Sequence, residues 1–316
     1  MSNHKMENDF LTVVEVKGKF DGPHLLVIAG VHGDEYEPME ACRRLFKEIE
    51  SKKDFLRGRL TCVPVVNRGA FQHGSRTGSD QLDLARTCPG RPDGSETEKA
   101  AYAVSQLIQN CDFLVDMHNG GRTYNISPLS GYVLHPDVKI LEQQRMMSQA
   151  FGLPISWGTD PTLQGRTLSV ARDAGVPAIY TEIGGQGIYH EAYTKLALIG
   201  CLNVMHFLKM LDGDDPHLAT LHQLEDYRME SGHLQKLLPA PTAGFFLPCV
   251  ALNDYVEEGD AIGTIQDESG AESLTIFANE PGMIFMLRCI PSVQEGDTLG
   301  GILPISEGEK VKSIYE

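Results

Sequence analysis

Several features that mark particular classes of protein are missing from this sequence of 316 residues. Its seven cysteines are scattered and form no C-x-x-C pair, so neither a disulfide framework nor a thiolate zinc site is indicated. No apolar run reaches the roughly 18 residues that a membrane span needs. The polar start, "MSNHKMENDF", also lacks the apolar core of a secretory signal. We therefore expect a cytoplasmic protein without a membrane partner.

Basic residues are also scarce, with 27 Lys and Arg against 43 Asp and Glu and a formal net charge of -16. Nucleic acids and anionic membranes are bound mainly through Lys and Arg, so this balance argues against both partners. The 41% apolar content is enough for a sizeable core. The expected partner is a small molecule, and homo-oligomerisation is left open.

Short apolar runs alternate with amphipathic segments over the first two thirds of the chain. This alternation predicts an α/β fold, a sheet flanked by helices. Ser95 and Glu98 have the spacing of a capping box at the start of one helix. The predicted strands cover 24–30, 59–66, 112–118 and 177–184, and the predicted helices cover 37–51, 95–110 and 190–211.

The composition changes after a linker-like stretch at 211–223, beyond which short β-like runs with frequent Gly and Pro follow. We therefore predict an α/β domain over 1–223 and a small β-rich domain over 224–316. Two similar decapeptides in the second domain, 256–265 and 293–302, indicate two related β-hairpin halves. They resemble biotinyl and lipoyl carrier domains, but no lysine lies between Lys236 and Lys310 to be modified. A structural, barrel-sandwich-like cap is the expected role.

Polar side chains follow two of the predicted strands where those strands end. His32 and Glu35 come after the first strand and His118 ends the third. Alone, H-x-x-E favours a solvated strand-to-helix turn over a metal site, but a second strand ending in histidine favours the metal site. Two histidines and one glutamate, with an open fourth position, form a catalytic zinc set. Asp116 lies on the same strand face as His118 and could orient its ring.

Glu182 ends the fourth predicted strand beside a group of glycines and is either an ordinary cap or a general base; we prefer the base. The long loop after the second strand is rich in Gly, Ser and Arg, although such charged runs are often only solvated surface. Binding loops occupy this position on α/β scaffolds. Because guanidinium groups hold carboxylates in a fork, the loop predicts a small anionic substrate.

These motifs resemble, in order and approximate spacing, those of the succinylglutamate desuccinylase and aspartoacylase family, a branch of the zinc carboxypeptidase clan. The matching segments are "GVHGDE", "VVNRGAF", "SRTGSDQLDLARTCPG", "DMHNGG" and "TEIGG". The resemblance implies a zinc-carboxypeptidase-like mixed sheet followed by a β domain. It also implies one zinc ion per chain, held by His32, Glu35 and His118, with Glu182 as the general acid/base.

By the same resemblance, Arg76 polarises the scissile carbonyl, and Arg86, Asn67 and Arg166 bind the substrate. The family writes D-L-N-R where this chain has Ala85 before Arg86, so an amide that contacts substrate in the family is missing here. The implied reaction is hydrolysis of the amide of a small N-acyl amino acid, a deacylase. Two alternatives are a carboxypeptidase-like peptidase for short peptides and a binding protein without catalysis.

Overall fold

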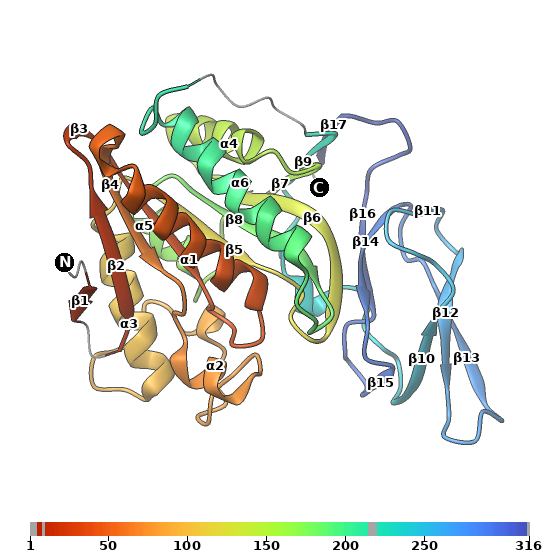
Figure 1. Ribbon diagram of the computed structural model, residues 1–316. Coiled ribbons are helices and arrows are strands. Elements are labelled where there is room, and N and C mark those ends of the chain that lie inside the picture. Colours follow the sequence, from red (N-terminus) through yellow and green to blue (C-terminus); the bar gives the residue numbers. More distant parts are fainter. Residues whose placement is uncertain (1–4, 8–9, 214–219, 315–316) are drawn as a thin grey trace.

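A twisted mixed sheet of 13 strands forms the centre of the computed structural model, which describes residues 5–7, 10–213 and 220–314 (Figure 1). The main path of the sheet runs β1-β2-β4-β3-β5-β8-β6-β7-β9-β17. The strands on this path are β1 (Lys5–Glu7), β2 (Thr12–Lys17), β3 (Phe20–Ala29), β4 (Arg57–Val63), β5 (Phe113–His118), β6 (Tyr124–Val133), β7 (Ile155–Thr159), β8 (Ala178–Gly185), β9 (His222–Asp226) and β17 (Val311–Ile314).

Helices cover both faces of this sheet, as the sequence predicts for an α/β fold (Figure 1). Three helices share one apolar core with the sheet, and two others share a second core on the opposite face. The first group is α1 (Tyr36–Ser51), α4 (Val138–Phe151) and α6 (Glu191–Phe207), and the second is α3 (Glu96–Ile108) and α5 (Thr167–Ala174). Short elements are α2 (Arg68–His73), η1 (Lys53–Phe55), η2 (Leu84–Arg86) and η3 (Leu234–Lys236).

The second half of strand β3, residues 25–29, is apolar without interruption because both of its faces are buried. Its side chains alternate between the two faces, so Leu25 and Val27 enter the core beneath α1 and α6. Leu26 and Ile28 enter the core beneath α3 and α5. Parallel neighbours, β4 and β5, flank the strand on both sides. A parallel strand buried on both faces has no solvated side, and a continuous apolar run is the result.

The predicted elements of the first two thirds of the chain are present, with ends displaced by a few residues. The capping box of α3 is confirmed, since Ser95 and Glu98 exchange side-chain and backbone hydrogen bonds. The last predicted helix ends at Phe207 and not at 211, and Lys209 follows with a φ of 57°. A left-handed residue at this position ends the helix because it turns the chain away from the helix axis.

The C-terminal strands form a second layer that is joined to the main sheet. Strand β14 pairs with β6 of the main sheet and also with β11 and β16, so the hydrogen bonding is continuous between the two parts (Figure 1). A separate four-stranded sheet has the order β13-β12-β10-β15. These strands are β10 (Gly244–Pro248), β11 (Tyr255–Val256), β12 (Ala261–Gln266), β13 (Ser273–Phe277), β14 (Gly282–Arg288), β15 (Ser292–Val293) and β16 (Gly300–Leu303).

The two decapeptides adopt the same turn. The Asp260 carboxylate accepts a hydrogen bond from the Glu257 amide at 2.8 Å, and Asp297 accepts one from the Gln294 amide at 3.0 Å. Gly259 and Gly296 have φ values of 90° and 87°. Neither decapeptide forms a hairpin by itself, however. Each carries the chain from one sheet to the other, because β11 and β16 pair with β14 whereas β12 and β15 pair with β10.

The main sheet continues past residue 223, where the sequence predicts the domains to divide. Strand β9 begins at His222 and pairs in parallel with β7, and β17 pairs in parallel with β9. The C-terminal β-rich part therefore returns its last strand to the sheet from which it departs. Among the described helices, none combines the length and the hydropathy needed to cross a lipid bilayer.

Glu225 links β9 to Tyr132 of β6 and to Arg145 of α4. Its carboxylate, 9% exposed, accepts hydrogen bonds from Arg145 Nε at 2.6 Å and from the Tyr132 hydroxyl at 2.9 Å. Burial by itself raises the pKa of Glu225, but Arg145 and Tyr132 bring it below its ordinary value of 4.5. Because the pKa of Glu225 is lower in the folded protein, its ionised carboxylate stabilises the fold at pH values above 4.5. This stabilisation is lost as the pH falls through the lowered pKa.

Replacing Glu225 with Gln should therefore lower the free energy of unfolding at pH 7 by about 1–3 kcal/mol, because Arg145 loses a charged partner. The difference between the two proteins should shrink as the pH is lowered from 5 to 3. Urea unfolding of both proteins across this range measures it. A difference that does not depend on pH would show that the charge of Glu225 contributes nothing.

Candidate metal centre and active site

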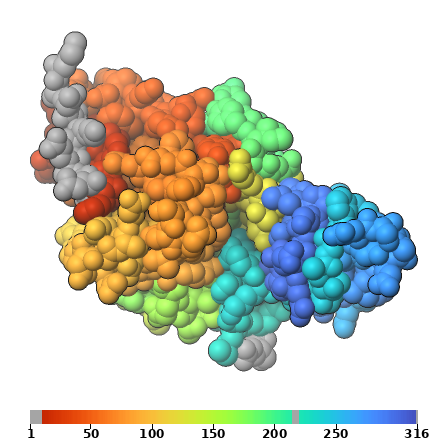
Figure 2. Space-filling view, turned by 90° about the horizontal axis from the view of Figure 1, so that it is seen from below, coloured from red at the N-terminus to blue at the C-terminus, as the bar shows by residue number. Residues whose placement is uncertain are grey.

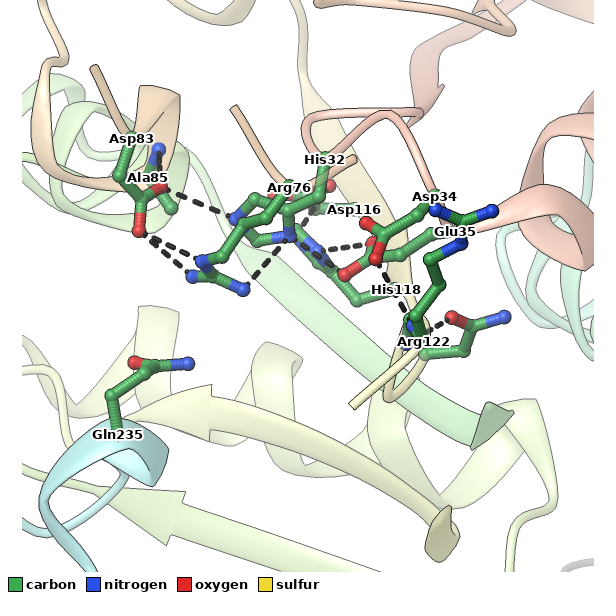
Figure 3. A network of polar contacts seen from close by, with 12 residues as sticks. His32, Asp34, Glu35, Arg76, Asp83, Ala85, Asp116, His118, Arg122 and Gln235 are labelled. Carbon is green, nitrogen blue, oxygen red and sulfur yellow. Dashed lines mark hydrogen bonds and ion pairs between the residues drawn. The ribbon is translucent and has the colours of Figure 1, made fainter. Parts of the chain in front are cut away.

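Three buried side chains converge at the carboxyl ends of β3 and β5, which are neighbours in the sheet. His32 and Glu35 lie in the loop between β3 and α1, and His118 is the last residue of β5 (Figure 3). Glu35 Oε1 lies 2.7 Å from His32 Nδ1, and Glu35 Oε2 lies 2.9 Å from His118 Nδ1. One potential ligand atom from each residue lies within 4.8 Å of the others. The structure thus brings the three predicted metal ligands together.

The second nitrogen of each ring faces a carboxylate. His118 Nε2 lies 3.1 Å from Asp116 Oδ1, which agrees with the predicted orienting role of Asp116. The other Asp116 oxygen accepts a hydrogen bond from the Thr167 hydroxyl. His32 Nε2 lies 3.3 Å from Asp83 Oδ1. The carboxylates of Asp116 and Asp83 thus orient both rings with Nδ1 towards Glu35. Two imidazoles and one carboxylate form a donor set that fits zinc.

The loop that carries His32 is held against α2 by a close backbone contact. The Gly33 amide donates to the Ser75 carbonyl at 3.0 Å. A Cβ atom on Gly33 would lie 1.9 Å from the carbonyl carbon of Ala70, so only glycine fits at this position. The glycine between the histidine and the acids in "GVHGDE" therefore allows the helix to support the metal-binding loop.

Two glutamates of the site differ in charge state. Burial raises the pKa of Glu35, but the facing imidazoles of His32 and His118 reverse this effect and lower it to about 2. Glu182, on β8, pairs in register with His118 and is 8% exposed. Burial raises the pKa of Glu182 to about 8. Its Oε2 has no hydrogen-bond partner among the described residues. Carboxylates with separated pKa values in one site are suited to different roles.

Asp83 connects the metal centre to the Arg-rich loop at 65–91, here called the arginine loop, and its sequence context alone indicates no role for it. It caps η2 by accepting from the Ala85 amide at 2.9 Å. Arg76 donates to Asp83 Oδ2 from Nε at 3.1 Å and from Nη2 at 2.9 Å. Arg76 Nη1 then lies 3.5 Å from His32 Nδ1 (Figure 3). The structure therefore places Arg76 beside the three residues that could hold a metal ion.

Arg86 and Arg166 line the same cavity. Within the described part of the chain, Arg86 donates to the Ala85 carbonyl and the Gln235 side chain, and Arg166 donates to the Gly232 carbonyl. Neither forms an ion pair with a carboxylate that the structure describes. Burial and the nearby charge of Arg166 lower the pKa of Arg86 to about 10. Two guanidinium groups that repel each other in one cavity favour binding of an anion.

The cavity has a volume of about 310 Å³ and is walled by both parts of the chain. Tyr180, two residues before Glu182 on β8, lines it with a hydroxyl that has no partner among the described residues. In Figure 2 the segment after β9 lies between the arginine-loop side of the molecule and the C-terminal strands. The residues that line the cavity beyond position 223 are Gly232, Leu234, Gln235, Met286, Arg288 and Asp297.

Asn67 is the predicted substrate-binding residue that the structure does not bring to the cavity. It is 2% exposed and caps α2, where its side chain accepts from the Ala70 amide at 3.0 Å. Its amide nitrogen lies 3.4 Å from the Thr97 hydroxyl. An asparagine immediately before a short helix is the sequence signal of such a cap. The geometry therefore indicates a structural role for Asn67.

Comparisons with known proteins agree with this geometry. A model of the "Succinylglutamate desuccinylase/Aspartoacylase catalytic domain" matches residues 21–208. The chain belongs to this family. A curated relative, N-alpha-acetyl-L-2,4-diaminobutyric acid deacetylase of Halomonas elongata, is 29% identical over 307 residues, which cover 93% of this chain and 86% of that protein.

Solved structures show the same fold. The Ectoine utilization protein EutE (DoeB) of Ruegeria pomeroyi, in a product-bound structure, is 26% identical with a TM-score of 0.82, covering 92% of this chain and 87% of that one. A succinylglutamatedesuccinylase/aspartoacylase from Rhodobacter sphaeroides has a TM-score of 0.83 at 24% identity, covering 94% of this chain and 90% of that one. The likeness extends over most of both chains and includes the C-terminal β-rich part.

Substitution of Asn67 can separate a helix-capping role from a substrate-binding role. Asn67→Ala should lower the free energy of unfolding by about 0.5–2 kcal/mol, because α2 loses its cap. Ser95→Ala, which removes the cap of α3, is the matched control and should cost a similar amount. Thermal unfolding and substrate KM measured on both variants test this. A raised KM with unchanged stability in Asn67→Ala would restore the substrate-binding role.

Proposed function

We propose that this protein is a zinc-dependent amidohydrolase that removes the acyl group from a small N-acyl amino acid bearing a free carboxylate. One observation carries the proposal: a two-histidine, one-glutamate centre shares a cavity with Glu182, whose Oε2 has no hydrogen-bond partner among the described residues, and with the two arginines Arg86 and Arg166. Family membership and the deacetylase named among the relatives support an amide as the bond cleaved.

The metal would be held by His32, Glu35 and His118. When bound there, zinc would act as a Lewis acid on the amide carbonyl and would lower the pKa of a coordinated water. The two rings present Nδ1 towards the shared carboxylate because Asp83 and Asp116 occupy their other nitrogens. The lowered pKa of Glu35 keeps this ligand ionised at neutral pH.

The remaining steps use side chains of the chain itself. Glu182 takes a proton from the attacking water as the oxygen adds to the amide carbon, and returns it to the amine nitrogen as the carbon–nitrogen bond breaks. A pKa of about 8 is close to neutral and suits both transfers. Arg76, fixed by Asp83, faces the oxygen that becomes negative. Arg86 and Arg166 hold the substrate carboxylate.

The shape of the cavity favours a small substrate over a peptide. Its volume is about 310 Å³, and Met286, Arg288 and Asp297 of the C-terminal strands close one side. Arg288 is fixed there by Asp297 at 2.9 Å and by the Ser292 carbonyl at 3.1 Å. A peptide extended from the scissile bond would meet this wall. We therefore propose that a carboxypeptidase-like activity on peptides is the weaker alternative.

Metal binding can be tested directly. The purified protein should bind about one zinc ion per chain, and His118→Ala should weaken binding severely because one of three protein ligands is lost. His73→Ala is the control, since His73 is exposed on α2 and lies outside the metal group. Elemental analysis after dialysis against a weak chelator reports the stoichiometry. Equal zinc content in wild type and His118→Ala would contradict the assignment.

Glu182→Gln tests the mechanism. The substitution keeps shape but removes the group that transfers the proton, so kcat should fall by ~10²–10⁴ while KM changes little. Zinc content, melting temperature and turnover should be measured on one preparation, with a panel of N-acyl amino acids and dipeptides. A fully active, zinc-loaded variant would refute the proposed role. Faster cleavage of dipeptides than of acylated amino acids by the wild type would favour the peptidase.

A further inference from the structure

Gln235 is a polar residue of the cavity for which the proposed mechanism has no role. It lies in η3, more than 140 residues beyond the arginine loop, yet its side-chain oxygen accepts a hydrogen bond from Arg86 Nη2. Figure 3 shows it opposite Asp83 and Ala85, on the other side of the space below Arg76. Both Ala85 and Gln235 line the cavity. The amide therefore reaches the proposed anion subsite from the C-terminal part of the chain.

The backbone that carries Gln235 is firmly attached to the end of β7. Asp160 is 3% exposed. Its backbone N–H donates to the Ser231 hydroxyl oxygen at 2.8 Å, and its carboxylate accepts from the Glu230 amide at 2.7 Å. Gly232 has a φ of 78°, and a Cβ there would lie 2.8 Å from the Thr159 side chain. Arg166 also donates to the Gly232 carbonyl at 3.2 Å. These contacts fix the base of η3 against the cavity wall.

The chemistry of the glutamine amide suits a carboxylate subsite. Its oxygen is used by Arg86, which leaves its NH₂ group as a donor, and a substrate carboxylate can accept from it. Ala85 presents only a methyl group on the opposite side, so no polar side chain at that position competes for the anion. A neutral amide orients Arg86 without neutralising it, whereas an acid would occupy the guanidinium fork.

We propose that Gln235 determines specificity for the substrate carboxylate: it positions Arg86 through its oxygen and contacts the carboxylate through its NH₂ group. This inference rests on the proposed function for the identity of the substrate class. The Gln235 amide that would recognise the substrate thus belongs to the C-terminal part of the chain. The arginine loop supplies the Arg86 guanidinium group.

The test uses zinc-loaded full-length protein and two probes, N-acetylglycine and its methyl ester, which differ in the charge that Gln235 is inferred to recognise. Calorimetry measures the dissociation constants of both probes for wild type, Gln235→Ala and Gln235→Glu. Gln149→Ala is the control, because Gln149 hydrogen-bonds Gln223 at 3.0 Å outside the cavity. Melting temperatures are measured on every protein, and turnover of the acid is followed separately.

Gln235→Ala should weaken binding of the acid about ten- to a hundred-fold, the cost of one or two hydrogen bonds to charged groups, and should change ester binding little. Gln235→Glu should weaken the acid at least as much while the melting temperature is kept or raised, because the new carboxylate pairs with Arg86. A merely structural glutamine would instead lose stability in Gln235→Ala and affect both probes alike.

Parallel losses for acid and ester, unchanged affinities in both variants, or a wild type that does not prefer the acid would each overturn the inference. The binding result does not depend on turnover. A wild-type protein that binds N-acetylglycine in preference to its methyl ester but hydrolyses no N-acyl amino acid would contradict the proposed function. The specificity role of Gln235 would still be supported in that case.

Discussion

The carboxylate of Glu35 is a charge buried between two imidazoles, and much of the molecule is arranged to make that position tolerable. At 2% exposure it has almost no water, so its charge has to be compensated by neighbouring groups. His32 and His118 provide this compensation from two adjacent parallel strand ends. Each ring in turn faces a further carboxylate, which makes the cluster rich in acids.

The second carboxylate of His32 belongs to Asp83, and through it the centre is coupled to the arginine loop. Asp83 caps η2, receives two hydrogen bonds from Arg76 and faces His32. Burial raises the pKa of Asp83, but His32, Arg76 and Arg86 hold it well below its usual range. One side chain thus contacts His32, Arg76 and the start of the segment that ends in Arg86. Its loss would disturb all three at once.

Some parts of this arrangement could be predicted from the sequence and others could not. His32 and Glu35 follow an apolar strand, and His118 and Glu182 lie at or near the ends of two others. Parallel strands place their ends together, so local pattern and topology agree. Asp116 was predicted because it shares a strand face with His118. The family motif implied substrate binding for Asn67, but a motif does not say whether a side chain caps a helix, and the fold places Asn67 at the cap of α2. Gln235 lies in a short 3-10 turn without periodicity, and only the tertiary fold brings it to Arg86.

Strands β9 and β17 are adjacent and parallel, although about 85 residues of chain separate them. The C-terminal β-rich part is therefore an insertion between two strands of the main sheet and not an appendage beyond it. During synthesis the outermost strand of that sheet emerges last, after the whole insertion. The sheet is completed by a contact between distant parts of the sequence, and such contacts form slowly because a long loop has to be closed first. The residues that wall the cavity are thus synthesised before the strand that completes the sheet.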